Sequence, residues 1–161
     1  MIQTERTLIR PVEIADEPDL FEIYKRPEVF EHFGSGVYTR ERNKASIERS
    51  VGKWKELGRG DLIAEFEGKV IGRFILFPAD TPEFELGYVL NPEYWGRGFA
   101  SEIACALVEY AFSLGEIQVK ACARKSNQVS RKLLKKLGFN ETQRQIGEDG
   151  IIRIWYVVTK Q

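Results

Sequence analysis

The sequence has few of the residues that build metal centres and nucleophile–histidine catalytic sites. His32 is its single histidine, and Cys105 and Cys122 are its two cysteines. The cysteine spacing matches neither a zinc-binding pattern nor a redox Cys-x-x-Cys motif, so we expect two reduced thiols and no metal. A catalytic triad would have to be built on one histidine. Any catalysis would therefore depend on carboxylates, hydroxyls, backbone amides and a bound co-substrate.

Long apolar runs and a net charge are also missing. No run is long enough to cross a bilayer, and the first residues lack a signal-peptide architecture, so we expect a cytoplasmic protein without a membrane partner. Its 161 residues, of which 43% are hydrophobic, predict one domain over residues 1–161. The sequence does not distinguish a monomer from a homodimer.

The balance of charges is uneven along the chain. Lysine plus arginine and aspartate plus glutamate total 24 each, yet residues 116–137 contain seven cationic side chains and one anionic one. A nucleic-acid binder usually has a basic domain as a whole. We therefore predict no nucleic-acid partner, and a small anionic ligand near this segment.

Hydrophobic periodicity predicts a mixed α/β fold. We expect a helix that is capped by Asp16 and runs to Lys25 before Pro27, a second helix that runs from Thr39 to Leu57 and is closed by Gly58, and a hairpin turn at Glu67-Gly68. The order of elements predicts a mostly antiparallel sheet that contains one parallel crossover and has flanking helices. The expected strands are residues 7–12, 61–66, 69–77, 83–90, 117–123, 139–146 and 151–159, and the other helices are 99–114 and 127–137.

The most informative stretch is Glu85-Leu86-Gly87-Tyr88-Val89-Leu90-Asn91-Pro92-Glu93-Tyr94-Trp95-Gly96-Arg97-Gly98-Phe99-Ala100-Ser101-Glu102. A strand runs into a glycine-bearing loop and then into a helix, whose free N–H groups suit a phosphate. Gly96 and Gly98 allow close backbone approach, and Arg97 adds a positive charge. A Walker loop is absent, and a dinucleotide fingerprint would need a glycine where Ser101 stands.

A second motif follows the next expected strand: Asn127-x-x-Ser130-x-x-Leu133-Leu134-x-Lys136-x-Gly138-Phe139. With the glycine loop it resembles the GNAT superfamily of acetyltransferases, over nearly the whole chain. The variant Tyr-Trp-Gly-x-Gly-Phe-Ala-x-Glu at 94–102 is similar to the branch that acetylates ribosomal-protein N-termini. The opening Thr4-Glu5-Arg6-Thr7-Leu8-Ile9-Arg10-Pro11 is similar to that branch too.

The resemblance implies a single GNAT-like domain in which the strands at 83–90 and 117–123 splay apart to admit acetyl-CoA. The opened backbone of the first strand would bind the pantetheine arm, Asn127 the pantetheine or acetyl end, and basic residues from Arg131 onward the adenosine phosphate. The implied cofactor-binding residues are Val89, Leu90, Trp95, Gly96, Arg97, Gly98, Phe99, Ala100, Ser101 and Asn127.

Two residues are the catalytic candidates. Glu85, or a water that it holds, would take the proton of an amine that attacks the thioester directly, while N–H groups near Leu90 stabilise the oxyanion. Glu83 and Glu102 are further base candidates. Ser130 would hydrogen-bond the departing sulfur. Glu85 as a surface carboxylate and Ser130 as a helix cap stay open as alternatives. Leu134 stands where many members of the superfamily have a proton-donating tyrosine, so the general acid also stays open.

The acceptor is the remaining question. The branch resemblance indicates a primary amine at a peptide or protein N-terminus, and the stretch 32–36 would line its cleft. An acetyltransferase for a small-molecule amine, a non-catalytic coenzyme A-binding regulator and a nicotinamide- or flavin-binding protein are the alternatives.

Overall fold

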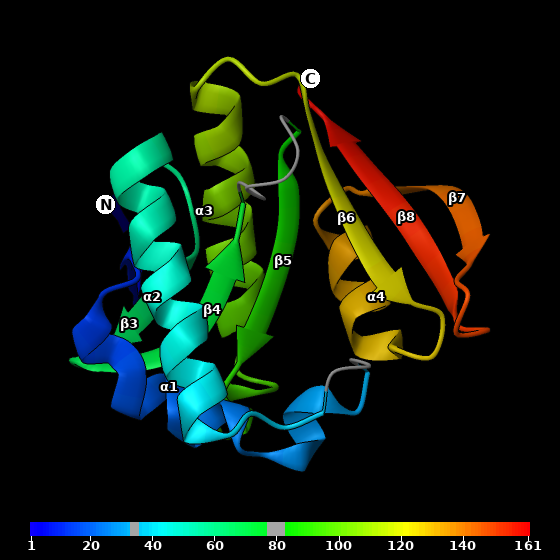
Figure 1. Ribbon diagram of the computed structural model, residues 1–161. Coiled ribbons are helices and arrows are strands. Elements are labelled where there is room, and N and C mark those ends of the chain that lie inside the picture. The colour runs from blue at the N-terminus through cyan, green and yellow to red at the C-terminus, as the bar shows by residue number, and fades with distance from the viewer. Residues whose placement is uncertain (33–35, 77–82) are drawn as a thin grey trace.

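Eight strands form one sheet in the computed structural model, which describes residues 1–32, 36–76 and 83–161 (Figure 1). They lie in the order β1-β2-β3-β4-β5-β6-β8-β7. The strands are β1 (Ile2–Gln3), β2 (Leu8–Pro11), β3 (Leu62–Phe66), β4 (Lys69–Ile75), β5 (Glu85–Leu90), β6 (Gln118–Arg124), β7 (Asn140–Ile146) and β8 (Ile152–Thr159).

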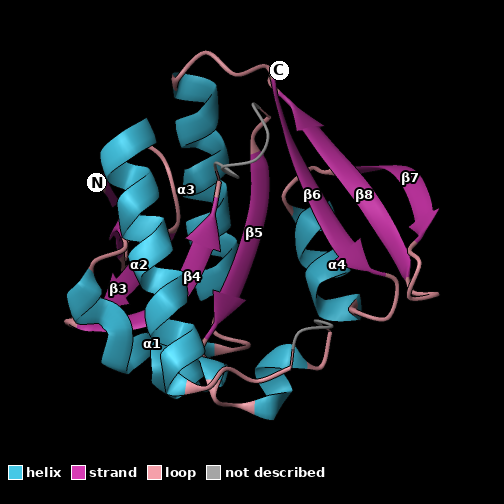
Figure 2. Cartoon of the chain, in the orientation of Figure 1, coloured by secondary structure: helices cyan, strands magenta, loops and turns pink. Residues whose placement is uncertain are grey.

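Helices cover both faces of the sheet (Figure 2). On one face, α1 and α2 bury Leu20, Ile23 and Ile47 against the sheet in one apolar cluster. On the other face, α3 and α4 contribute Leu107 and Leu134 to a second, larger cluster. The helices are α1 (Glu17–Tyr24), α2 (Arg40–Leu57), α3 (Phe99–Ser113) and α4 (Gln128–Lys136), with short 3-10 turns η1 (Ile14–Asp16), η2 (Pro27–Phe30) and η3 (Pro92–Tyr94).

Local turn chemistry explains several element boundaries. Glu67 and Gly68 both have positive φ, 50° and 76°, which is the backbone of a two-residue hairpin turn, and they join β3 to β4. The Thr39 side chain accepts a hydrogen bond from the Arg42 amide and caps α2, and Gly58 ends that helix in the left-handed conformation. These three predictions are confirmed.

The predicted cap of α1 is wrong. The Asp16 side chain makes no hydrogen bond to the start of that helix. It accepts instead from the Glu13 amide and forms an ion pair with Arg10 at 2.8 Å, because a buried carboxylate is better satisfied by a guanidinium. Strand β1 was not expected from the sequence, since two residues are too short to show a period.

The predicted splay between two parallel strands is confirmed. β5 and β6 form the one parallel pair among the described strands, and they are in register only at Glu85–Lys120 and Leu86–Ala121. Beyond Leu86, β5 pairs with β4 alone, while β6 continues along β8 (Figure 2). The sheet therefore opens between Gly87–Leu90 on one side and the end of β6 on the other.

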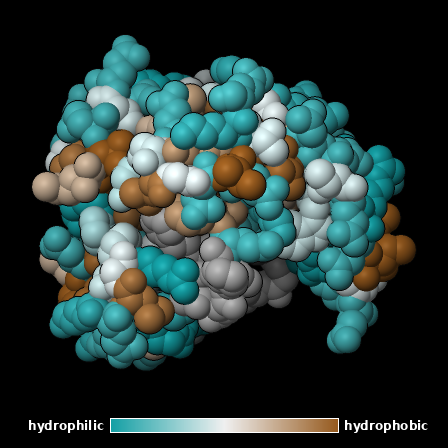
Figure 3. All heavy atoms as spheres, turned by 90° about the horizontal axis from the view of Figure 1, so that it is seen from above, coloured by the Kyte–Doolittle hydropathy of each residue, from teal (hydrophilic) through white to brown (hydrophobic). Residues whose placement is uncertain are grey.

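The surface around the C-terminus and the α3–β6 connection is mostly hydrophilic, with small separate groups of hydrophobic residues (Figure 3). Within the described ranges, none of the helices combines the length and apolarity that crossing a membrane requires. The same residues contain no group of three or more histidine, cysteine or acidic side chains placed to hold a metal.

Candidate active site

A pocket of about 760 Å³ lies where β5 and β6 separate, a volume that suits a small-molecule ligand. Its walls come from both strands, from the loop before α3 and from α4. The glycine loop and the Asn127 motif, which are distant in sequence, therefore meet at one site. The predicted site residues that line it are Leu90, Trp95, Gly96, Gly98, Phe99, Ala100, Ser101, Asn127 and Ser130.

Three predicted site residues do not line the pocket with their side chains. Val89 packs against the apolar cluster of α1 and α2 on the opposite face. Arg97 stacks over Phe99, with its guanidinium carbon 5.2 Å from the ring centroid. Glu85 lies outside the lining as well, although Cys122, whose thiol senses the Glu85 charge, is part of it.

The start of α3 presents free backbone donors to the pocket. Gly96 and Gly98 have φ of 71° and 83°, a left-handed conformation that favours glycine at both positions. Gly98 is the N-cap of α3, and no side chain caps this helix end. The first helical bond runs from the Glu102 amide to the Gly98 carbonyl at 3.0 Å, so the amides of the first turn remain available to an anion.

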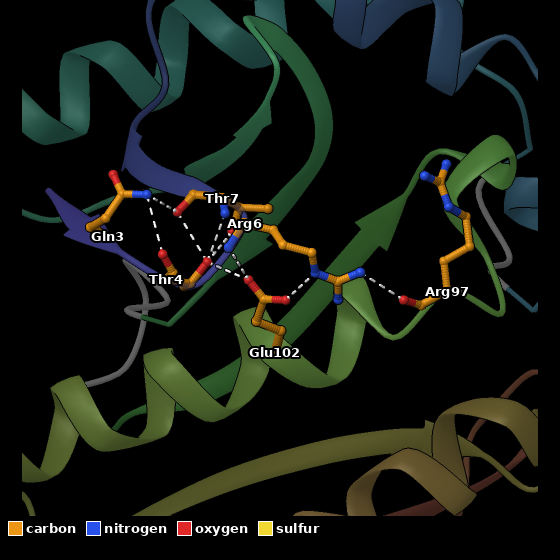
Figure 4. Close-up of polar contacts among 6 residues, drawn as sticks. All are labelled: Gln3, Thr4, Arg6, Thr7, Arg97 and Glu102. Atoms are coloured by element: carbon orange, nitrogen blue, oxygen red, sulfur yellow. Dashed lines mark hydrogen bonds and ion pairs between the residues drawn. The ribbon is translucent and has the colours of Figure 1, made fainter.

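Behind this turn, the N-terminal segment holds the loop in place (Figure 4). Glu102 accepts hydrogen bonds from the Thr4 hydroxyl at 2.5 Å, the Arg6 amide at 2.9 Å and Arg6 Nε at 2.6 Å. Arg6 Nη1 also donates to the Arg97 carbonyl at 3.0 Å. We call Thr4, Arg6 and Glu102 the N-terminal clamp. It joins the first turn of α3 to the loop that contains both glycines.

The clamp explains the electrostatics of Glu102. Partial burial alone would raise the pKa of this carboxyl, but hydrogen bonds from Thr4, the Arg6 amide and the Arg6 guanidinium outweigh that effect and lower it. A carboxylate with a lowered pKa and three donors is a poor proton acceptor. Glu102 is therefore better suited to positioning the loop than to acting as a base.

Asn127 and Ser130 lie at the start of α4. The Asn127 side-chain oxygen accepts from the Ser130 amide at 3.0 Å, so Asn127 caps the helix. The Ser130 hydroxyl has a partner that the sequence did not indicate: the Tyr88 hydroxyl donates to Ser130 Oγ at 3.2 Å. Tyr88 lines the same pocket. Strand alternation places it beside Leu86 and Leu90, but only the packing of α4 brings it to Ser130.

Glu85 is half-buried beside the splay. Desolvation raises the pKa of its carboxyl, although nearby Lys120 opposes the shift and Glu83 adds to it. Lys120 itself forms an ion pair with Glu83 at 2.6 Å. A carboxylate with a raised pKa is a stronger base than an exposed one, which suits proton removal from an amine.

One side of the pocket is lined by Glu28, Glu31 and His32, which belong to η2 and the turn after it. His32 Nδ1 lies 3.4 Å from Ser126 Oγ. Of the expected acceptor stretch 32–36, residues 33–35 lie outside the described residues. Arg131, the first of the basic residues expected near the adenosine phosphate, does not line the pocket; it donates to the Tyr156 hydroxyl and to the Lys125 carbonyl, both at 3.1 Å.

Comparison with known proteins agrees with this architecture. The family described as Acetyltransferase (GNAT) domain matches residues 6–140. The chain is 31% identical over 139 residues to an uncharacterized N-acetyltransferase, YnaD, of Bacillus subtilis (strain 168), which covers 85% of this chain and 81% of YnaD. A GNAT-family acetyltransferase structure from Bacillus anthracis superposes with a TM-score of 0.86 at 23% identity, covering 98% of this chain and 97% of that one.

A more distant structure has the same fold. It is RimL, described as a ribosomal L7/L12 α-N-protein acetyltransferase in complex with coenzyme A. The TM-score is 0.84 at 14% identity, over 97% of this chain and 95% of that one.

Proposed function

The chain belongs to the GNAT family of N-acetyltransferases, and we propose that it moves the acetyl group of acetyl-CoA to the free α-amine of a peptide or protein. The observation that carries the proposal is the pocket between β5 and β6, because its lining includes both the start of α3, with its free backbone donors, and the side chains of Ser130 and Tyr88. The acetyl transfer follows from the family. The donor and the acceptor are our inference.

The donor is inferred from the anion site at the start of α3. The uncapped amides of the first turn, with Gly96 and Gly98 beside them, suit a pyrophosphate, and the lining of the pocket includes both this site and residues of the splayed strands. The structurally similar RimL was solved with coenzyme A. In this chain Leu90, Trp95 and Asn127 would then contact the pantetheine arm.

The chemistry is a direct attack of a neutral amine on the thioester. The Asn91 amide donates to the Ile71 carbonyl of β4 at 2.8 Å. Because N–H groups alternate along a strand, the preceding N–H of Leu90 points to the other edge, into the splay, where an oxyanion could accept it. Glu85, or a water bound to it, takes the amine proton. The nitrogen–carbon bond forms, and the carbon–sulfur bond breaks.

The acceptor is inferred from the small number of side chains at the site that can act as a general base. A lysine amine has a pKa of about 10.4 and an α-amine one of about 8, so near neutral pH far more of the α-amine is already neutral. One histidine, His32, lines the described part of the pocket, with its Nδ1 near Ser126 Oγ, and Glu85 lies just outside the lining. Such a site favours an amine that needs little deprotonation.

A pair of peptides tests the proposal. One carries a free N-terminus and no lysine, and the other is blocked at its α-nitrogen and contains one lysine. We expect faster thiol release from acetyl-CoA with the first peptide. A clear preference for the blocked lysine peptide would refute the acceptor assignment. Turnover with small amines alone would favour a small-molecule acceptor instead.

A further inference from the structure

Two hydroxyl groups from opposite sides of the splay meet inside the pocket. Tyr88 comes from β5 and Ser130 from the first turn of α4, and their oxygens are 3.2 Å apart. The Tyr88 ring is held by stacking on buried Phe74, with ring centroids 6.1 Å apart. Ser130 is held by the capped start of its helix, where its amide donates to Asn127. The contact therefore joins two side chains whose backbones are fixed independently.

The direction of this hydrogen bond determines what Ser130 can do. Burial raises the pKa of the Tyr88 hydroxyl, although the bond to Ser130 lowers it in part, so Tyr88 keeps its proton at neutral pH. Tyr88 donates and Ser130 Oγ accepts. The proton of Ser130 is then left for a different acceptor, and within the described parts of the chain the Ser130 hydroxyl has no second hydrogen-bond partner.

On the basis of the proposed acetyl transfer, we propose that Tyr88 is a positioning residue that aims the Ser130 hydroxyl at the departing sulfur. Ser130 is the group that touches the sulfur, and Tyr88 acts through it. This arrangement supplies a donor on the pocket wall where Leu134, which is buried and apolar, offers none. It also explains why a tyrosine lies on β5 facing α4.

The step balances without a further reactant. The amine nitrogen forms a bond to the carbonyl carbon, and the electron pair of the breaking carbon–sulfur bond goes to sulfur. Ser130 stabilises the developing thiolate by a hydrogen bond, and the thiolate takes up through solvent the proton that the amine loses. The proton of the amine goes to Glu85 or its water. Tyr88 does not ionise, because a buried phenolate with a raised pKa is a poor product of proton transfer.

A double-mutant cycle tests the proposal, using Tyr88→Phe, Ser130→Ala and the double variant. Tyr88→Phe keeps the ring and removes the hydroxyl. We expect its kcat to fall about 3- to 10-fold, the effect of one hydrogen bond, with the KM for acetyl-CoA changed less than about twofold. In the Ser130→Ala background the same change should have no further effect on kcat. The control is Tyr38→Phe, which removes a hydroxyl outside the pocket.

A second readout does not depend on turnover. The thiol of bound coenzyme A is titrated by the ultraviolet absorbance of its thiolate. If Tyr88 orients Ser130, removing the Tyr88 hydroxyl in Tyr88→Phe should raise the pKa of the bound thiol. Ser130→Ala should raise that pKa at least as much.

The outcomes separate this proposal from the proposed function. If the wild type releases no thiol from acetyl-CoA, the function itself fails. The positioning role is refuted if the wild type turns over and Tyr88→Phe is equally active. It is also refuted if Tyr88→Phe lowers kcat by the same factor in the wild-type and in the Ser130→Ala background. An unchanged thiol pKa in Tyr88→Phe bound to coenzyme A refutes it as well.

Discussion

Replacing Glu102 with alanine tests whether the N-terminal clamp holds the anion site in shape. The change leaves the Thr4 hydroxyl, the Arg6 amide and the Arg6 guanidinium without their common acceptor. Hydrogen bonds to charged groups contribute about 1.5–3 kcal/mol each when buried. Both bonds from Arg6 are exposed, so solvent removes most of their contribution, and the partly buried bond from Thr4 dominates the loss. We expect the free energy of unfolding to fall by about 1–3 kcal/mol in total.

The assay combines denaturant unfolding with calorimetric binding of acetyl-CoA. A loss of this size lowers the Tm by about 2–4 °C per kcal/mol in a protein of this length. Binding should weaken as well, because the Arg6 bond to the Arg97 carbonyl fixes the loop and depends on the clamp. Glu109→Ala, on the same helix and with only a 3.6 Å contact to Cys105, is the matched control. Normal stability and normal affinity of Glu102→Ala would refute the reasoning.

The clamp also has a pH signature. The pKa of Glu102 is lowered in the folded protein, so the stabilisation is present above the ordinary carboxyl value of about 4.5 and is lost as the pH falls through the lowered value. The difference in the free energy of unfolding between wild type and Glu102→Gln should therefore shrink as the pH falls below 4.5. A difference that stays constant down to acid pH would contradict the assignment.

Three further changes test the pocket. Gly98→Val forces a branched side chain to φ of 83°, with a Cβ about 3.4 Å from Arg6 Nη2. The variant should fold but show no thermal shift with acetyl-CoA, and a retained shift would exclude this loop from binding. Asn127→Ala removes the cap of α4, so the free energy of unfolding should fall by about 0.5–2 kcal/mol and the binding of acetyl-CoA should weaken. Asn127→Asp keeps the cap, so normal binding by this variant would limit Asn127 to capping. Glu85→Gln should slow turnover most at low pH, and turnover should recover in part as the pH rises, because hydroxide then shares the deprotonation of the amine. An unchanged pH–rate profile would remove Glu85 from the mechanism.

Local chemistry made much of the fold predictable from the sequence. Thr39 and Gly58 bound α2, and Glu67-Gly68 forms the turn between β3 and β4, because each feature depends on a few neighbouring residues. The glycine loop that leads into α3 was predictable for the same reason, since the glycines and the helix start are consecutive. The role of Asp16 was not, because Arg10 competes for its carboxylate from another element.

The supporting contacts of the site were not predictable, because they join segments distant in sequence. Tyr88 and Ser130 come from a strand and a helix that face each other only after β5 and β6 separate. Arg6, near the N-terminus, pairs with Glu102, which lies 96 residues further along the chain. The motif around Arg6 was visible in the sequence, but its contribution to the loop before α3 depends on where β2 lies in the sheet.

Measuring thiol release and peptide acetylation in one reaction shows whether the protein transfers the acetyl group to an α-amine. Wild-type protein is incubated with acetyl-CoA and a peptide that has a free N-terminus, and thiol release and peptide mass are followed together. We expect one acetyl group on the α-nitrogen for each thiol released, and no release with Gly98→Val. A wild-type protein that is stabilised by acetyl-CoA but releases no thiol with any amine, and leaves the peptide unmodified, would contradict this expectation.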